Sequence, residues 1–502
     1  MGIVRQQSIR SSIFIYIGFA VGAFNLLVLF TRYLTPEQYG MLNLVLNFAV
    51  LASSIATLGT VPVINKFFPF YNDYLSPKKN DLPFLTAVIC GIGFLLFVLA
   101  SVLFEGLIIR KFGKNSALFV QYYYLVYPTT FFLLLFTLLE SFAWGIRKTV
   151  LSNFLRETAV KVYPMMIILL VALGWISFGQ FAFLYSLLYV IPCLVLLFYL
   201  AGTGRFKIHP SISHVTRRLR GKMLIFSAYI FSGSIFNSLS KTLEQLFIAS
   251  INGLGDTARY TLADYIIRVM EVPQRSMAAI TTPLLAAHWK NKAYGEIRTL
   301  YQKSAVTLLI FGIFILGLIW TNVGNLLLFL PRDFSRPAIR QVILILGIGK
   351  LVDLATGINN QLIQTSNYWR FDFFSNITFI LLSIPLNFVL VHRFGIIGAS
   401  LTISFTLILF NLMRFCFIWW KFRFQPFTGK TLLVLAWGVV AYGASRLFPY
   451  LGNLYVDTLV RSLVFGPVFA FGILRWNASD DVTQLWQKWK NKLLHSGSPP
   501  AT

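Results

Sequence analysis

Long apolar stretches, separated by short polar segments, recur along the whole chain. About fourteen of them approach or exceed the roughly 20 residues that a helix needs to cross a bilayer. They span residues 11–33, 42–65, 83–104, 118–142, 151–176, 178–201, 224–250, 260–287, 304–330, 341–364, 371–391, 395–420, 430–448 and 456–474. Because little chain remains between them, the pattern predicts an all-α polytopic membrane protein with about fourteen transmembrane helices.

The composition agrees with this pattern and changes how the charge is interpreted. Hydrophobic residues make up 57% of the chain and charged residues only 12%, whereas about 25% of a soluble protein is charged. The 43 Lys and Arg residues outnumber the 17 Asp and Glu residues, for a net charge of +26. A balance this basic is typical of nucleic-acid binding, but the apolar stretches favour a membrane protein. We therefore expect membrane lipid, and no nucleic acid, as a partner.

The distribution of Lys and Arg predicts the orientation of the chain in the membrane. Basic residues gather in alternate loops, most clearly in 202–223 and 288–303. Because Lys and Arg collect in cytoplasmic loops, we predict a multi-pass protein with both termini in the cytoplasm. The predicted outer loop that holds Arg110, Lys111 and Lys114 goes against this orientation.

The basic loop at 202–223 divides the first twelve predicted spans into two sets of six. We predict an N-terminal six-helix bundle over 1–201, a basic cytoplasmic linker over 202–223, a second six-helix bundle over 224–420, two further helices over 421–476 and a cytoplasmic tail over 477–502. Tyr39 and Tyr260 each follow a polar turn at the start of an even-numbered span, which is a weak internal echo. Internal repeats are common in transporters, which bind substrate between the repeats.

Three short segments carry a resemblance to a known family. They are Arg-Tyr-Leu-Thr-Pro-Glu-Gln-Tyr-Gly at 32–40, Pro-Leu-Asn at 385–387 followed by Phe-Gly-Ile-Ile-Gly-Ala-Ser at 394–400, and the turn that leads into Tyr260. In this order among the predicted spans, they make the chain resemble the polysaccharide, or O-antigen, flippases of the multidrug/oligosaccharidyl-lipid/polysaccharide exporter superfamily.

The resemblance implies two six-helix bundles around a central cavity that opens alternately to each side of the bacterial inner membrane. It implies a lipid-linked oligosaccharide as cargo, usually on undecaprenyl diphosphate, for the synthesis of surface polysaccharide such as the O-antigen of lipopolysaccharide. It also implies coupling to a proton or sodium gradient in some members, and contacts with the polysaccharide polymerase machinery. It assigns no substrate residues, so the candidates come from the residues of this chain.

Ionisable residues inside the predicted spans are the candidates for a functional site, because charges at bilayer depth are costly and usually face a cavity or pair with each other. They are Glu140, Arg156, Glu157, Lys161, Lys241, Glu244, Asp264, Arg268, Glu271, Arg275, Lys350, Asp353 and Arg414. The four from Asp264 to Arg275 step by four, three and four residues, which places them on one helix face. Pro273 lies inside this stripe and predicts a kink.

The chemistry of a diphosphate head group divides these residues by role. Arg offers phosphate a planar fork of donors and Lys a point charge; we predict substrate binding by Arg268, Arg275, Lys241, Lys350 and Lys161. Carboxylates can accept protons during transport; the candidates for ion coupling are Asp264, Glu271, Glu244 and Asp353. The alternative is that each of these cations pairs with a nearby carboxylate in a salt bridge that holds helices together. Glu140, Arg156 and Arg414 lie near span ends, where we expect them to extend to the membrane interface.

Motifs for catalysis are absent from the sequence, which contains neither HExxH nor a Walker A loop. We therefore predict a transporter that is not an enzyme and has no metal site or cofactor. One alternative is a multidrug or cation antiporter of the same superfamily, which would favour an acidic cavity. Another is a membrane-embedded polysaccharide polymerase or acyltransferase, which would need a large outer loop or a polar catalytic cluster.

Overall fold

The computed structural model describes residues 14–146, 148–204, 206–207, 209–480, 482–484 and 486–487. Ten side chains in the helices lie outside this description, at positions 229, 230, 232, 234, 236, 237, 240, 241, 369 and 373. The described residues form helices and turns without a strand, which confirms the all-α class. Contacts between residues group them into two compact units, which are described separately below.

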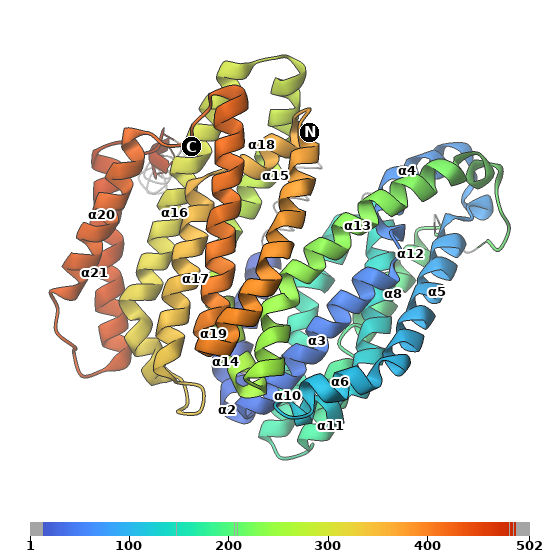
Figure 1. Ribbon diagram of the computed structural model, residues 1–502, viewed down its shortest axis with the longest axis horizontal. Helices are drawn as coiled ribbons and strands as arrows, with labels where there is room; N and C mark the ends of the chain where they lie inside the picture. The colour runs from blue at the N-terminus through green and yellow to red at the C-terminus, as the bar shows by residue number, and fades with distance from the viewer. Residues whose placement is uncertain are drawn as a thin grey trace, which may run out of the picture. The chain divides into compact units, whose positions relative to one another are not determined.

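Unit 1 comprises the described residues up to Leu262 together with Val391–Ile396. It begins with a helix from Phe14 to Tyr33 that contains η1 (Asn25–Phe30) and α2 (Thr31–Tyr33). It continues through α3 (Pro36–Ala56), α4 (Thr60–Tyr74), η2 (Pro77–Lys79), α5 (Leu82–Leu103), α6 (Glu105–Phe112), α7 (Ala117–Gln121), η3 (Tyr123–Leu125), α8 (Val126–Gly145), α9 (Thr149–Phe154), η4 (Leu155–Ala159), α10 (Val160–Ala172), α11 (Phe178–Ser186), α12 (Val190–Gly202), α13 (His214–Ile251) and the first part of α14 (Leu254–Arg268). Helices α3, α4 and α12 pack against α8, and α13 runs along α3 and α4 (Figure 1).

Unit 2 comprises Ala263–Leu390 and the described residues from Ile397 onward. Its helices are the end of α14, α15 (Glu271–Lys290), α16 (Tyr294–Phe329), α17 (Pro337–Ala355), α18 (Asn359–Thr365), α19 (Trp369–Phe422), α20 (Gly429–Arg446) and α21 (Leu454–Arg475). Helix α16 is central to the unit, because α15, α17, α20 and α21 all pack against it. Buried Phe465 and Phe469 of α21 and Val434 of α20 form an apolar core with α16.

The segment Thr35–Gly40, which carried part of the family resemblance, begins α3. The side chain of Thr35 accepts a hydrogen bond from the backbone N–H of Gln38 at 3.2 Å, and Gln38 Oε1 accepts one from the N–H of Thr35 at 3.0 Å. This capping box, with Pro36 in the first turn, fixes the start of the helix. A glycine is needed at position 40 because the backbone of Leu254 lies very close. A Cβ at Gly40 would stand 2.0 Å from the carbonyl oxygen of Leu254. The two segments that echoed each other in the sequence are therefore in contact within unit 1.

Two helix breaks lie where the sequence predicted interruptions. Helix α19 is two helices that meet at Gly395, whose φ of 56° and ψ of −132° are not helical. This matches the predicted boundary between spans 371–391 and 395–420. The predicted kink at Pro273 is also confirmed, because α14 ends at Arg268 and α15 begins at Glu271. A proline clashes with the carbonyl four residues earlier, and Val269 is that residue.

The predicted number of about fourteen spans is not confirmed. Eight helices of the described residues are long and apolar enough to cross a membrane, or nine if α17 and α18, bent by 47°, form one span. Helix α19 is counted once although Gly395 divides it. Others of the predicted spans correspond to helices that are short or interrupted, such as α10, which η4 separates from α9, or that carry several charges, such as α15. Charges and breaks within helices therefore account for the difference.

The linker predicted at 202–223 does not coincide with the division between the two units. Helix α13 begins at His214 and packs on α3 and α4, so it is grouped with unit 1 up to Leu262. The predicted pair of six-helix bundles, with its boundary at the linker, stays a prediction.

Candidate functional site

The charged stripe predicted from Asp264 to Arg275 is present as two ion pairs, one on each side of the helix break. The Arg268 Nε donates to Asp264 Oδ2 at 2.7 Å at the end of α14. The Arg275 Nη2 donates to Glu271 Oε2 at 2.9 Å at the start of α15. The side chain of Arg275 is 64% exposed and that of Arg268 is 40% exposed. Each pair therefore keeps cationic surface accessible.

Helix α17 contributes a third ion pair, Lys350–Asp353, which is joined to the Glu271–Arg275 pair of α15. The Lys350 Nζ lies 2.8 Å from Asp353 Oδ2 and 3.7 Å from Glu271 Oε1. Gln274 bridges the two α17 residues, because its Oε1 accepts from Lys350 at 2.9 Å and its Nε2 donates to Asp353 at 3.0 Å. The pair is mostly buried, with side-chain exposures of 14% and 13%. Lys350 is thus shared between two carboxylates on two helices.

Asn411 of α19 extends the same set of contacts to a fully buried position. Its Nδ2 donates to Asp353 Oδ1 at 3.0 Å, and its Oδ1 accepts from Thr356 at 2.9 Å and from Asn359 at 2.8 Å. We name the six residues Glu271, Gln274, Arg275, Lys350, Asp353 and Asn411 the α15–α17 network. Two carboxylates and two cations make its formal charge zero, and it runs from an exposed guanidinium to an amide with 0% exposure.

The sequence identified the four charged members of the α15–α17 network but missed its two amides. Gln274 stands three residues after Glu271, on the same helix face, which is a signal that a search for charges alone passes over. Asn411 is a polar residue within an apolar run of α19. Asp372, which lies near the start of that helix, was also missed.

Asp372 forms a separate buried cluster with Arg414, both on α19. The Arg414 guanidinium contacts the Asp372 carboxylate, donates to Asn360 Oδ1 at 2.8 Å and lies 3.9 Å from the ring centroid of Phe410. Arg414 is 5% exposed and Asp372 is 7% exposed. The expectation that Arg414 extends to the membrane interface is therefore wrong, because its charge is matched by a carboxylate inside the unit.

Glu140 and Arg156 form an ion pair in unit 1 in which the carboxylate is buried and the side chain of Arg156 is 36% exposed. Arg156 donates to both carboxylate oxygens of Glu140, from Nε at 2.8 Å and also from Nη2. The side chain of Glu140 is 3% exposed, so its expected extension to the interface is wrong as well. The Arg156 guanidinium also lies 5.3 Å from the ring centroid of Phe136. The pair joins α8 to η4 and has the geometry of a brace.

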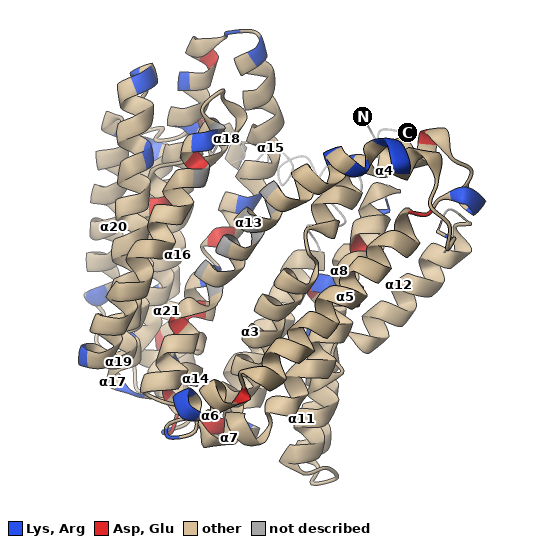
Figure 2. Cartoon of the chain, turned by 45° about the vertical axis from the view of Figure 1, so that its right-hand side comes forward, with Lys and Arg blue, Asp and Glu red and all other residues tan. Residues whose placement is uncertain are grey.

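The remaining candidates are in unit 1 or partly outside the described residues. Lys161 of α10 lies 3.4 Å from Glu157 of η4, and both side chains are 27% exposed. Glu244 is buried on α13 with 5% exposure. Lys241 precedes Glu244 by three residues, so the two are expected on one helix face, but the side chain of Lys241 lies outside the described residues. Figure 2 shows acidic and basic segments along the helices as well as at their ends.

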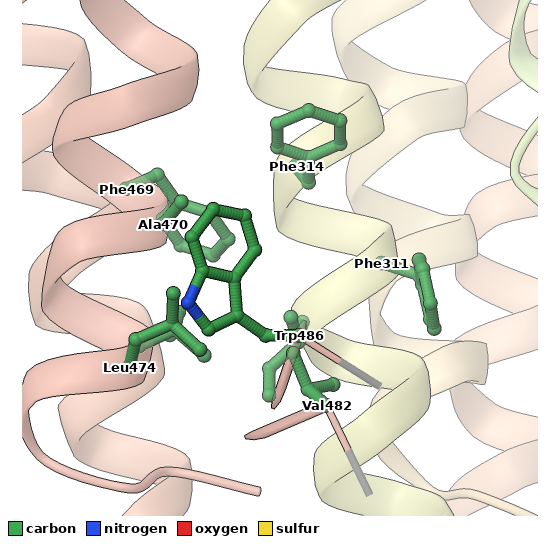
Figure 3. Close-up of a pocket in the computed structure, with 9 residues that line it drawn as sticks. Phe311, Phe314, Phe469, Ala470, Leu474, Val482 and Trp486 are labelled. Atoms are coloured by element: carbon green, nitrogen blue, oxygen red, sulfur yellow. The ribbon is translucent and has the colours of Figure 1, made fainter. Parts of the chain in front are cut away.

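An apolar groove lies between α16 and α21 in unit 2. Figure 3 shows the indole of Trp486 standing between Phe314 of α16 and Phe469 of α21. The lining residues are Ile310, Phe311, Phe314, Phe469, Ala470, Ile473, Leu474, Val482 and Trp486. The surface of the groove is almost entirely hydrocarbon, which suits an apolar chain and excludes an unpaired charge.

Comparisons with known proteins agree with the helical architecture. A family model described as polysaccharide biosynthesis protein matches residues 8–289. Among solved structures, the lipid II flippase MurJ in an inward closed conformation has a TM-score of 0.70 at 16% identity, over 93% of this chain and 99% of that chain. An inward-facing multidrug resistance MATE transporter of the MOP superfamily has a TM-score of 0.63 at 13% identity, over 82% of this chain and 94% of that one.

A third structure extends the likeness to a transporter of different pocket chemistry. It is a MOP superfamily transporter from Pyrococcus furiosus, described as having a reverse polarity of the binding pocket that suggests a different function; its TM-score is 0.58 at 13% identity, over 83% of this chain and 95% of that chain. No curated protein matched the sequence. These likenesses show that the chain shares the fold of the three solved proteins.

Proposed function

Because the chain belongs to the polysaccharide biosynthesis protein family, we propose that it is a flippase that moves a lipid-diphosphate-linked oligosaccharide across the bacterial inner membrane. It works by alternating access, and its product is used for the synthesis of surface polysaccharide. The proposed carrier is of the undecaprenyl diphosphate type. The likeness of fold to the lipid II flippase MurJ supports a lipid-linked cargo.

The observation that carries this proposal is the accessible cationic surface of the charged stripe from Asp264 to Arg275, which shares Glu271 and Arg275 with the α15–α17 network. Arg275 and Arg268 are 64% and 40% exposed although both lie in the predicted membrane span 260–287. A diphosphate group needs such donors while it leaves water, and a guanidinium offers two of them in one plane. Lys350, whose Nζ lies 3.7 Å from Glu271 Oε1, is the more buried cation of the α15–α17 network. Lys161 and Lys241 are proposed as further cations for the head group.

The apolar groove between α16 and α21 supports the lipid part of the proposed cargo. A polyprenyl chain consists of hydrocarbon and gains from contact with an apolar lining such as Phe314, Phe469 and Trp486. The groove and the α15–α17 network both belong to unit 2. A cargo with a charged head group and an apolar tail therefore finds both kinds of surface in one unit.

Ion coupling is proposed for the carboxylates that share a cation. Glu271 and Asp353 both contact Lys350, and the formal charge of the α15–α17 network is zero. Binding of one proton or one sodium ion would change this charge to +1 and favour the diphosphate. Asp264 and Glu244 are the other proposed coupling residues. A transport rate in proteoliposomes that is indifferent to both imposed gradients would leave facilitated flipping.

The test is charge reversal at the exposed end of the stripe, with a matched control. In proteoliposomes loaded with a fluorescent lipid-linked oligosaccharide, Arg275→Glu and Arg268→Glu should lower the flipping rate at least about a hundredfold, because like charges repel the diphosphate. Arg332→Glu, at an exposed arginine between α16 and α17, should keep the native rate. Native rates in both stripe variants would contradict the proposal.

The second candidate function is export of cationic drugs, which the likeness to MATE transporters supports. An acidic surface would serve that cargo, whereas the α15–α17 network is neutral. The same proteoliposomes distinguish the two functions: a cationic dye that is moved faster than the lipid-linked oligosaccharide would favour the antiporter. A polysaccharide polymerase or acyltransferase is a more distant alternative, because the fold is that of transporters.

A further inference from the structure

The first three turns of α13 combine an apolar face, which is packed, with a basic face, which is not. Val215 and Met223 are 5% and 7% exposed and belong to the core of unit 1, and Leu219 packs against that core. The cations between them, Arg217, Arg218, Arg220 and Lys222, are all exposed. The periodicity of the helix therefore directs four positive charges outward from a fixed apolar seam.

This helix end is held in place by groups from two other elements of unit 1. The buried Asp81, which is 2% exposed, accepts hydrogen bonds from the Ser213 backbone N–H at 2.8 Å and from the Thr216 hydroxyl at 2.7 Å. The Tyr71 hydroxyl of α4 lies 2.7 Å from the same Thr216 oxygen. The basic face is thus presented from a braced position and not from a free loop.

The four cations do not serve the stability of their own helix. Arg217 lies at the end of the first turn of α13, where the macrodipole opposes a cation, and this turn contains no acidic residue to balance it. The ion pairs found among the described residues include none of the four. The four charges are exposed and therefore accessible to a ligand.

Neighbouring elements add to the same basic surface. Lys78 and Lys79 of η2 are exposed, and Lys66 of α4 places its ammonium 3.9 Å from the ring centroid of Phe226 on α13. Figure 2 shows basic segments where α4 and the beginning of α13 meet. We name this surface, made by Lys66, Lys78, Lys79, Arg217, Arg218, Arg220 and Lys222, the basic ridge.

Large apolar side chains lie exposed directly beside the basic ridge. Leu224 and Ile225 follow Lys222 on α13 with 70% and 76% exposure, and Ile212 precedes the helix with 62%. On α4, Phe70 and Tyr74 are 45% and 69% exposed. A row of cations next to exposed apolar side chains matches the boundary between lipid head groups and hydrocarbon.

We propose that the basic ridge binds the phosphate groups of anionic phospholipids at the membrane surface. The cations contact the head groups, and Leu224 and Ile225 contact the acyl chains below them. This assignment goes beyond the proposed transport function, since it concerns structural lipid and not cargo. It gives a specific role to part of the net positive charge, which the sequence explained only as a signal for orientation.

The experiment uses the full-length protein in detergent with a reporter beside the basic ridge. In a Cys416→Ser background, a fluorescent dye on Ile212→Cys is titrated with brominated phosphatidylglycerol or brominated phosphatidylcholine, which quench the dye on contact. We expect quenching at roughly tenfold lower concentration of the anionic lipid, since each cation near an anionic surface contributes about a fivefold preference before screening by salt.

Two triple variants separate a specific surface from overall charge. Arg217→Gln, Arg218→Gln and Arg220→Gln together should abolish the preference. The control Lys290→Gln, Lys292→Gln and Arg298→Gln, at exposed cations of unit 2, should retain it. Lysine at the three ridge positions should also retain it, which excludes loss of the fold as the cause.

Three outcomes would overturn the assignment. The first is equal quenching by both lipids in the native protein, and the second is an equal loss of preference in both glutamine triples. The third is displacement of the lipid signal by polyglutamate together with tighter binding of polyglutamate than of phosphatidylglycerol. That result would assign the basic ridge to an acidic protein partner instead.

Discussion

The Glu140–Arg156 pair of unit 1 and the α15–α17 network of unit 2 place charges inside helical units in two different ways. In the first, one guanidinium that is 36% exposed meets both oxygens of one carboxylate that is 3% exposed, and its other contact is the ring of Phe136. In the second, Lys350 is shared by two carboxylates, and the series continues outward to an arginine that is 64% exposed. A closed pair stabilises a structure, whereas an open series retains groups that can exchange partners. The three predictions below test that difference.

The largest effect on stability is expected at the closed pair. Glu140→Gln leaves the Arg156 charge without its carboxylate and should lower the free energy of unfolding by about 2.5 kcal/mol, less than for a fully buried pair because Arg156, at 36% exposure, keeps contact with solvent. Thermal unfolding in detergent measures this loss. Replacing both residues by leucine should restore stability to within about 1 kcal/mol. Transport per folded molecule should be native in the double variant; a loss of transport at native stability would show that the pair is not merely a brace.

An intermediate effect is expected at the buried end of the α15–α17 network. Asn411→Ala removes the hydrogen bonds to Asp353, Thr356 and Asn359 and should cost about 2 kcal/mol of unfolding free energy. It should also slow transport, since Asp353 loses a donor that helps to hold it beside Lys350. Asn322→Ala is the matched control, because Asn322 of α16 bonds to Ser462 outside the network. Equal transport by the two variants would separate the network from function.

The smallest effect is expected at the half-exposed pair of unit 1. Glu157 and Lys161 lie 3.4 Å apart at 27% exposure, and exposed ion pairs contribute about 0.5 kcal/mol. Lys161→Gln should therefore leave the unfolding temperature nearly unchanged. Its flipping rate is the informative measurement. A decrease of more than about tenfold at native stability would support Lys161 as a further cation for the head group, whereas a native rate would remove it and leave the head group to the cations of unit 2.

The sequence predicted contacts within a helix better than contacts between helices. The pairs Asp264–Arg268 and Glu271–Arg275 follow from a spacing of four residues and are present. The pair Glu140–Arg156 joins two helices across a turn, and its partners are sixteen residues apart. No periodicity encodes such a distance, so the sequence placed both residues at the membrane interface.

The same limit applies to the polar residues that the sequence passed over. Gln274 and Asn411 carry no charge. Asp372 stands at the start of the predicted span 371–391, and a carboxylate at a span end is common and does not indicate a site. Their importance appears only when α15, α17 and α19 are brought together by apolar packing. By contrast, the helix breaks at Pro273 and Gly395 were predictable, because they depend on the covalent structure of a single residue.

Gly395 determines more than the local path of the chain. A straight helix of 54 residues would be about 80 Å long at 1.5 Å per residue, more than twice the roughly 30 Å of a bilayer core. The φ of Gly395, 56°, is one that residues with a Cβ rarely adopt. The chain can therefore divide this length into two crossings at Gly395. Since the spans 371–391 and 395–420 are each predicted to cross the membrane, we expect the face on which α20 begins to depend on the stereochemistry of this one residue.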